Sequence, residues 1–289
     1  MRIAHISDFH LRHHLPGTSL VAKRQSRQMP ALLRQAIAQI NALQPDLLAI
    51  TGDLVDYPLH ALDDPATLAQ GDQDLLLIRE IIDEATCPVA YLYGNHDHPA
   101  RYRTLFADQP SDRPIGDYRL LTFLDDEVRD NTAERLDASR QLFDAALTDT
   151  DPRPQIHLQH YMIFPEHNEG YPHNYREAKD LQKAIAASRK VRLSLSGHFH
   201  HGADLQLQDG AWYATARAFC MKRVDDAAFK GGDSILNKAA LVQRIGMNHR
   251  LDVHFIRNIE AVIYRRWRCA PVLMEFERRS VREKVVSFR

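Results

Sequence analysis

The chain has 289 residues, of which 44% are hydrophobic and 26% are charged, so it can build one large α/β domain with a substantial core. It contains no run of about 18 apolar residues, which excludes a transmembrane segment. The first ten residues, MRIAHISDFH, do not resemble a signal peptide, and the three cysteines form no CxxC pair. We therefore expect a cytoplasmic protein that has neither a disulfide framework nor a thiolate zinc site.

The net charge of −1 is unevenly distributed along the chain. Residues 221–289 contain 15 lysines and arginines against 8 aspartates and glutamates, whereas 14 of the 16 histidines lie before Met221. This division predicts a catalytic domain with metal ligands over residues 1–220 and a basic C-terminal appendage over residues 221–289.

Apolar runs and helical periodicities alternate along the first part of the chain. Residues 2–7 (RIAHIS) and 46–51 (DLLAIT) are typical of buried strands. Between them, apolar residues recur every three or four positions over residues 26–43, which predicts an amphipathic helix. The same alternation predicts helices over residues 72–85, 133–147 and 175–188, and strands over 89–93, 119–124, 155–161, 191–196, 203–208 and 211–215.

Turn and loop signals separate these elements. Asp209-Gly210 predicts a tight hairpin turn between the last two strands. Residues 59–71 and 107–117 are rich in Pro, Asp and Gly, and we expect them to be surface loops. After Cys220 the alternation stops, and helices over residues 235–245 and 251–266 are an open interpretation.

Polar clusters follow five of the predicted strands at the points where they end. In α/β sheets, ligand sites form at the carboxyl ends of the strands, so we expect these clusters to meet at one edge. They are Asp8 with His10, Gly52-Asp53, Gly94-Asn95-His96-Asp97, His160, and Gly197-His198-Phe199-His200.

The residue types in these clusters are those of a metal site without sulfur. Residues two apart in an extended segment point to the same side, so Asp8 with His10 and His198 with His200 can reach inward as pairs. The neighbouring glycines permit close backbone approach. Carboxylates, imidazoles and one amide suit Mn, Fe or Zn better than Ca or Cu(I).

These five motifs, in this order, resemble the calcineurin-like metallophosphoesterase superfamily over residues 1–217. The resemblance implies a four-layer α-β-β-α sandwich with two divalent metal ions. It implies that Asp53 bridges both ions and that His96 faces the scissile phosphate. It further implies that Asp8, His10 and His200 hold the first metal, and that Asn95, His160 and His198 hold the second.

Two close cations can lower the pKa of a bridging water and clamp the phosphoryl oxygens, which favours attack by metal-bound hydroxide without a covalent intermediate. His96 can stabilise the developing charge or protonate the leaving oxygen, and Asp97 can orient a site residue. We also treat Asn95, His96 and His173 as candidate substrate contacts. His157 is the alternative to His160.

The segment after the second motif bears on the substrate. Asp56 is followed by Tyr57-Pro58, where protein Ser/Thr phosphatases of the superfamily continue with Arg-Gly. The sequence instead resembles the bacterial phosphodiesterase branch, which includes cyclic-nucleotide phosphodiesterases. We therefore expect a phosphodiesterase that acts on a small phosphodiester such as a cyclic nucleotide.

Two other functions are open at this point. A metal-dependent nuclease would use the basic tail, whose densest patch is residues 264–268, to hold nucleic acid. A non-catalytic scaffold with the same fold would be expected to have lost ligands, and here every expected ligand is present. The basic patch is also compatible with a solvated helix face or with a subunit contact in a homo-oligomer.

Overall fold

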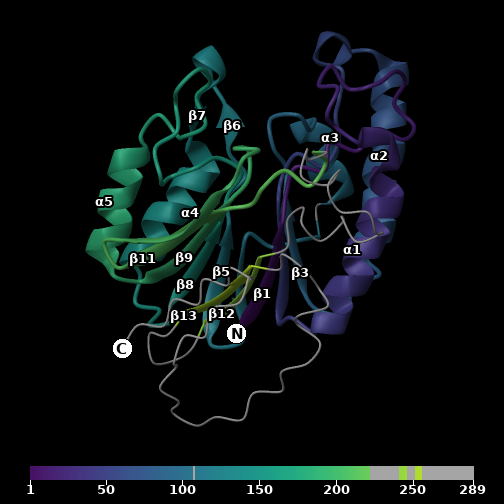
Figure 1. Ribbon diagram of the computed structural model, residues 1–289. Coiled ribbons are helices and arrows are strands. Elements are labelled where there is room, and N and C mark those ends of the chain that lie inside the picture. The colour runs from purple at the N-terminus through teal and green to yellow at the C-terminus, as the bar shows by residue number, and fades with distance from the viewer. Residues whose placement is uncertain (107, 222–240, 246–250, 256–289) are drawn as a thin grey trace, which may run out of the picture.

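A computed structural model describes residues 1–106, 108–221, 241–245 and 251–255. Two large β-sheets face each other, and helices cover the outer face of each (Figure 1). This is the predicted α/β fold, with its layers in the order α-β-β-α. No helix among the described residues is both long enough and apolar enough to cross a membrane.

The first sheet has the strand order β13-β12-β1-β2-β3. Strands β1 (Arg2–Ile6), β2 (Leu47–Thr51) and β3 (Val89–Leu92) run parallel, as expected of βαβ units. Strand β12 (Leu241–Ile245) pairs antiparallel with β1 and with β13 (Leu251–Phe255). The helices predicted over residues 235–245 and 251–266 are therefore wrong where β12 and β13 lie. The other residues of 222–289 lie outside the described residues.

The second sheet has the order β10-β11-β9-β8-β5-β4. Its four central strands are parallel: β11 (Ala211–Thr215), β9 (Val191–Ser196), β8 (Gln155–Leu158) and β5 (Tyr118–Thr122). The edges are antiparallel. One edge is β10 (Ala203–Gln208), which reaches β11 through the predicted turn at Asp209-Gly210, and the other is β4 (Asp112–Ile115).

Within the described residues, three hydrophobic clusters hold the layers together. One lies between the sheets and includes Ile3, Leu158 and Leu195, all fully buried. A second joins the first sheet to α1 (Met29–Leu43), α2 (Pro65–Ile82) and α3 (Pro99–Leu105). A short 3-10 helix, η1 (Ser26–Gln28), leads into α1. The third joins the second sheet to α4 (Asp137–Thr148) and α5 (Ala178–Ser188).

Several boundaries differ from the sequence predictions. The loop predicted over residues 59–71 contains η2 (Leu59–Ala61) and the first two turns of α2, because Asp64 caps the helix by accepting a hydrogen bond from the Thr67 amide at 2.7 Å. The second predicted loop contains β4. Residues 126–134, in part predicted as helix, form η3 (Arg129–Asn131) between two short strands, β6 (Asp126–Glu127) and β7 (Ala133–Glu134).

One buried carboxylate fixes the segment that follows β1. Asp74 of α2 accepts hydrogen bonds from the backbone amides of His13, His14 and Leu15, at 2.7 to 3.2 Å. Its side chain is fully buried, and so is Leu15, whose amide has no other acceptor nearby among the described residues. Asp74 therefore anchors the chain just beyond the first polar motif.

We expect Asp74→Ala to lower the free energy of unfolding by about 1–3 kcal/mol, because it removes the acceptor of three amides, of which that of Leu15 is buried. Urea denaturation measures this change. The control is Asp63→Ala, which removes an exposed carboxylate just before α2 and should be close to neutral. Equal stability of the two variants would contradict the anchoring role.

Candidate functional site

The five polar motifs meet at one end of the sandwich, where strands of both sheets end. Asp8, Asp53 and Asn95 follow β1, β2 and β3 of the first sheet, while His160 and His198 follow β8 and β9 of the second. All of these except Asn95 are buried, with exposed fractions of 0 to 6%. Each sheet therefore supplies part of a single polar site.

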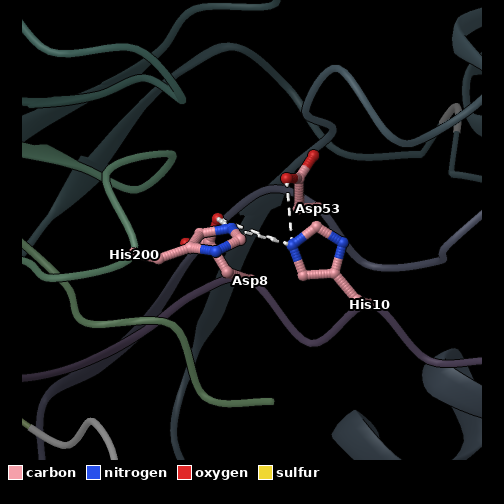
Figure 2. Close-up of side chains that lie close together, drawn as sticks. All are labelled: Asp8, His10, Asp53 and His200. Carbon is pink, nitrogen blue, oxygen red and sulfur yellow. Dashed lines mark hydrogen bonds and ion pairs between the residues drawn. The ribbon is translucent and has the colours of Figure 1, made fainter. Parts of the chain in front are cut away.

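A first cluster contains Asp8, His10, Asp53 and His200, whose ligand atoms lie within 4.8 Å of one another. The His10 Nε2 atom is 3.3 Å from Asp53 Oδ2 and 3.1 Å from His200 Nε2. The His200 Nε2 atom is 3.5 Å from Asp8 Oδ1. Figure 2 shows the ring nitrogens and carboxylate oxygens facing one another. Atoms spaced in this way can surround one cation at about 2 Å from each.

A second cluster contains Asp53, His160 and His198. The His160 Nε2 atom is 3.3 Å from Asp53 Oδ1 and 3.2 Å from Asn95 Oδ1. The His160 Nδ1 atom lies 2.6 Å from the Thr51 carbonyl oxygen, which can only accept a hydrogen bond. His160 therefore donates from Nδ1 and directs Nε2 toward Asp53 and Asn95.

Asp53 is shared by both clusters. Its two oxygens face different histidines, with Oδ2 toward His10 and Oδ1 toward His160, and Oδ1 also accepts the His96 amide at 2.9 Å. Burial raises the pKa of Asp53, but the charges on His160 and His10 hold it well below its usual range. The carboxylate is therefore ionised at the centre of the site.

Backbone strain, and not strand alternation, brings several of these side chains together. Strand β1 ends at Ile6, and Asp8 and His10 have φ angles of 58° and 45°. Asp53 and His198 also have positive φ, at 52° and 66°. Such angles are uncommon for residues other than glycine and cluster at functional sites. The predicted pairing of Asp8 with His10 is found, but the geometry behind it is different.

Gly94 leaves the space that the centre of the site needs. A Cβ atom at this position would lie 2.5 Å from the His160 ring and would also meet Asp53 Oδ1. Real Cβ atoms do not approach other atoms this closely, so a larger residue would push the shared carboxylate and His160 aside. The glycine of the third motif is thus required by packing.

His96 lies beside the first cluster, and its ring centroid is 4.6 Å from that of His10. Its Nδ1 atom is 3.2 Å from Asp56 Oδ1, and its side chain is 21% exposed. Burial lowers the pKa of His96, but the charges of Asp53 and Asp56 raise it above its ordinary value. His96 is therefore a partly exposed imidazole that favours its protonated form, and it could donate a proton at this site.

The sequence analysis missed Asp56 and Arg24 as parts of this site. The Arg24 Nη1 atom is 3.0 Å from Asp56 Oδ1, and its Nη2 atom is 3.5 Å from His96 Nε2. Asp56 lies three residues after Asp53, so its place in the second motif was a usable signal. Arg24 precedes α1 by five positions, and nothing in its sequence context pointed to the site.

Asp97 is occupied by the backbone. Its carboxylate accepts hydrogen bonds from the amides of Leu54, Val55 and Gly94, at 2.8 to 3.0 Å. Burial and the charge of Asp53 raise the pKa of Asp97 to about 7. These contacts tie the second motif to the third, so the geometry of Asp97 is that of a positioning residue.

His173 lies next to the second cluster, as a substrate contact would. Its ring centroid is 5.4 Å from that of His198 and 4.9 Å from that of Phe199. Tyr171 also approaches His198, with ring centroids 5.7 Å apart. Aromatic rings therefore form a wall beside His198, and the sequence analysis had singled out only His173 from it.

His157 is not part of the site. It is fully buried, and its Nε2 atom is 2.9 Å from Gln155 Oε1. Its ring packs against Phe123 and Phe143 on the side of the second sheet that α4 covers. Strand alternation turns His157 into this core, which leaves His160 at the site.

The comparison with family models gives a match to calcineurin-like phosphoesterases over residues 1–202. The chain belongs to this family. The match confirms the resemblance drawn from the five motifs, and it makes the protein a member of a family of phosphoric ester hydrolases. No curated protein matches this phosphoesterase in sequence.

Solved structures share the fold of this phosphoesterase. A dimetal phosphatase from Danio rerio has a TM-score of 0.63 and 14% identity, with 87% of this chain and 94% of that chain covered. Purple acid phosphatase PPD1 from yellow lupin has a TM-score of 0.58 and 14% identity, with 87% of this chain and 50% of that chain covered. At this level of identity the likeness establishes the fold alone.

His160 gives a test of the site's electrostatics in metal-free protein. Burial lowers its pKa, but the charge of Asp53 and the hydrogen bond to it raise the pKa to about 9. The bound proton should thus stabilise the fold below about pH 6.5, and this stabilisation should be lost as the pH rises toward 9.

NMR titration of the histidine rings in chelator-treated protein should show a midpoint near pH 9 for His160. His5 is the matched control, because burial lowers its pKa to about 3 and it should stay neutral over the same range. His160→Gln should flatten the fall in stability between pH 6.5 and 9. A His160 midpoint at or below 6.5 would contradict this electrostatic account.

Proposed function

We propose that this phosphoesterase is a hydrolase with two divalent metal ions, Mn, Fe or Zn, that share Asp53. The first ion would be held by Asp8, His10 and His200, and the second by Asn95, His160 and His198. The observation that carries the proposal is the position of Asp53 in both clusters, with one oxygen toward each.

The donor atoms fit such a centre. Two of them, Asp53 Oδ2 and His198 Nε2, are buried and have no hydrogen-bond partner in the described part of the chain. Buried polar atoms without partners are costly, and a bound cation would satisfy both. The hydrogen bond from His160 to the Thr51 carbonyl fixes the tautomer that a ligand needs, as is common for metal-binding histidines.

When bound, two such cations would polarise the phosphoryl group and supply hydroxide near neutral pH. The residues around them have separate tasks. His96, held by Asp56, would face the scissile phosphate and stabilise charge or deliver a proton to the leaving oxygen. Asp97 would act through the backbone by holding the second and third motifs in register.

For the substrate we propose a small phosphodiester such as a cyclic nucleotide. The Tyr57-Pro58 sequence after Asp56 departs from the protein phosphatases of the superfamily, and this supports a non-protein substrate. The aromatic wall of Tyr171, His173 and Phe199 beside His198 offers rings on which a base or another planar leaving group could pack. His173 remains our candidate substrate contact, and a cytoplasmic location remains a prediction.

The nuclease alternative depends on the basic tail, most of which lies outside the described residues. It predicts hydrolysis that falls steeply with salt, because phosphate contacts along a strand release counterions. A small phosphodiester contacts few cationic groups, so its hydrolysis should depend weakly on salt. The salt dependence of turnover therefore separates the two functions.

The substrate class can be tested with bis(p-nitrophenyl) phosphate and p-nitrophenyl phosphate in the presence of added Mn²⁺. We expect metal-dependent release of p-nitrophenol from the diester in clear preference to the monoester. Removal of metal with a chelator should abolish it, and Mn²⁺ should restore it. Preference for the monoester would contradict the phosphodiesterase assignment, and inactivity of metal-loaded protein on both would favour a scaffold.

A further inference from the structure

The guanidinium of Arg24 is buried at the site, and the proposed function assigns it no task. Its side chain is only 6% exposed. The Nη1 atom binds Asp56 at 3.0 Å, and the Nη2 atom faces His96 Nε2 at 3.5 Å. The Nε atom has no hydrogen-bond partner in the part of the chain that the structure describes. The Nε–Nη2 edge of the guanidinium thus lacks a carboxylate acceptor there.

Arg24 shares its carboxylate partner with a second guanidinium. Arg24 Nη1 is 3.0 Å from Asp56 Oδ1, and Arg12 Nη2 is 3.2 Å from Asp56 Oδ2. Among the described residues, neither arginine has a second carboxylate within ion-pair distance. A phosphoryl oxygen would give Arg24 an anionic partner of its own.

The backbone around Arg24 is fixed, so the guanidinium is held in place for a ligand. The Arg24 amide donates to the Val21 carbonyl at 2.9 Å, and the Gln25 amide donates to the Cys220 carbonyl at 2.8 Å. Arg12 holds the same loop by donating to the carbonyls of Pro16 and Thr18. A group that is ordered in advance loses little entropy on binding.

We propose that Arg24 binds a non-bridging phosphoryl oxygen of the substrate, beside His96 and the two metal positions. Arginine suits this task because its planar fork matches the geometry of a phosphate and its charge is permanent. The ligand is the phosphate group common to the ester and to inorganic phosphate. This inference rests on the proposed function, since Arg24 can contact a phosphoryl oxygen only if the phosphate binds beside His96.

The test measures inorganic phosphate binding to Mn²⁺-loaded protein by isothermal titration calorimetry, with metal content measured in each sample. Arg24→Gln should weaken phosphate binding about 10- to 100-fold, since it removes a charged hydrogen bond. Arg24→Lys, which keeps the charge but not the fork, should lie between wild type and Arg24→Gln. Both should keep the wild-type metal content, because Arg12 still pairs with Asp56.

The matched control is Arg27→Gln. Arg27 lies in the same segment and donates to the carbonyls of His13 and Gly17, but it is exposed, and its hydrogen bonds within the described residues do not reach the site. We expect it to bind phosphate as wild type does. Equal weakening in the Arg24 and Arg27 variants would show that loop order alone matters, and would overturn the proposal.

Unchanged phosphate affinity in Arg24→Gln would also overturn the proposal, while leaving the proposed function intact if the wild-type protein still hydrolyses the diester. Wild-type protein that hydrolyses neither ester would overturn the proposed function and this inference with it. If Arg24→Gln does not fold, the comparison of Arg24→Lys with Arg27→Gln decides the question.

Discussion

The site depends on one buried carboxylate that side chains from both sheets must stabilise. Asp53 is 1% exposed, and its oxygens face His10 and His160, which come from opposite sheets. Burying an ionised group without a partner is costly, so the sheets have to bring cationic or metal-bound groups to this point. The rest of the architecture serves to place residues from both sheets around Asp53.

Contacts across the junction keep this arrangement rigid. The His198 amide donates to the Asp8 carboxylate at 3.2 Å, and His160 Nδ1 donates to the Thr51 carbonyl at 2.6 Å. The strained backbone at Asp8, Asp53 and His198 persists because such bonds and the packing over-determine it. We interpret this strain as the cost of holding the donor atoms ready for metal ions.

The positions of most strands along the chain, and the meeting of the polar motifs at their ends, could be predicted from sequence, because such motifs follow a general rule. The features that the sequence did not reveal depend on contacts made in the folded chain. Asp64 starts α2 earlier than the apolar pattern suggested, and β12 forms through pairing with β1, which periodicity in residues 235–245 does not reveal. Arg24 reaches the site only through the folded loop, so no spacing rule could identify it.

The central claim is that two metal ions share Asp53, and anomalous diffraction from crystals grown with Mn²⁺ tests it most directly. We predict two anomalous peaks about 3.5–4 Å apart, one on each side of the Asp53 carboxylate, with His10 beside one and His160 beside the other. A single peak, or two peaks of which neither touches Asp53, would contradict the account.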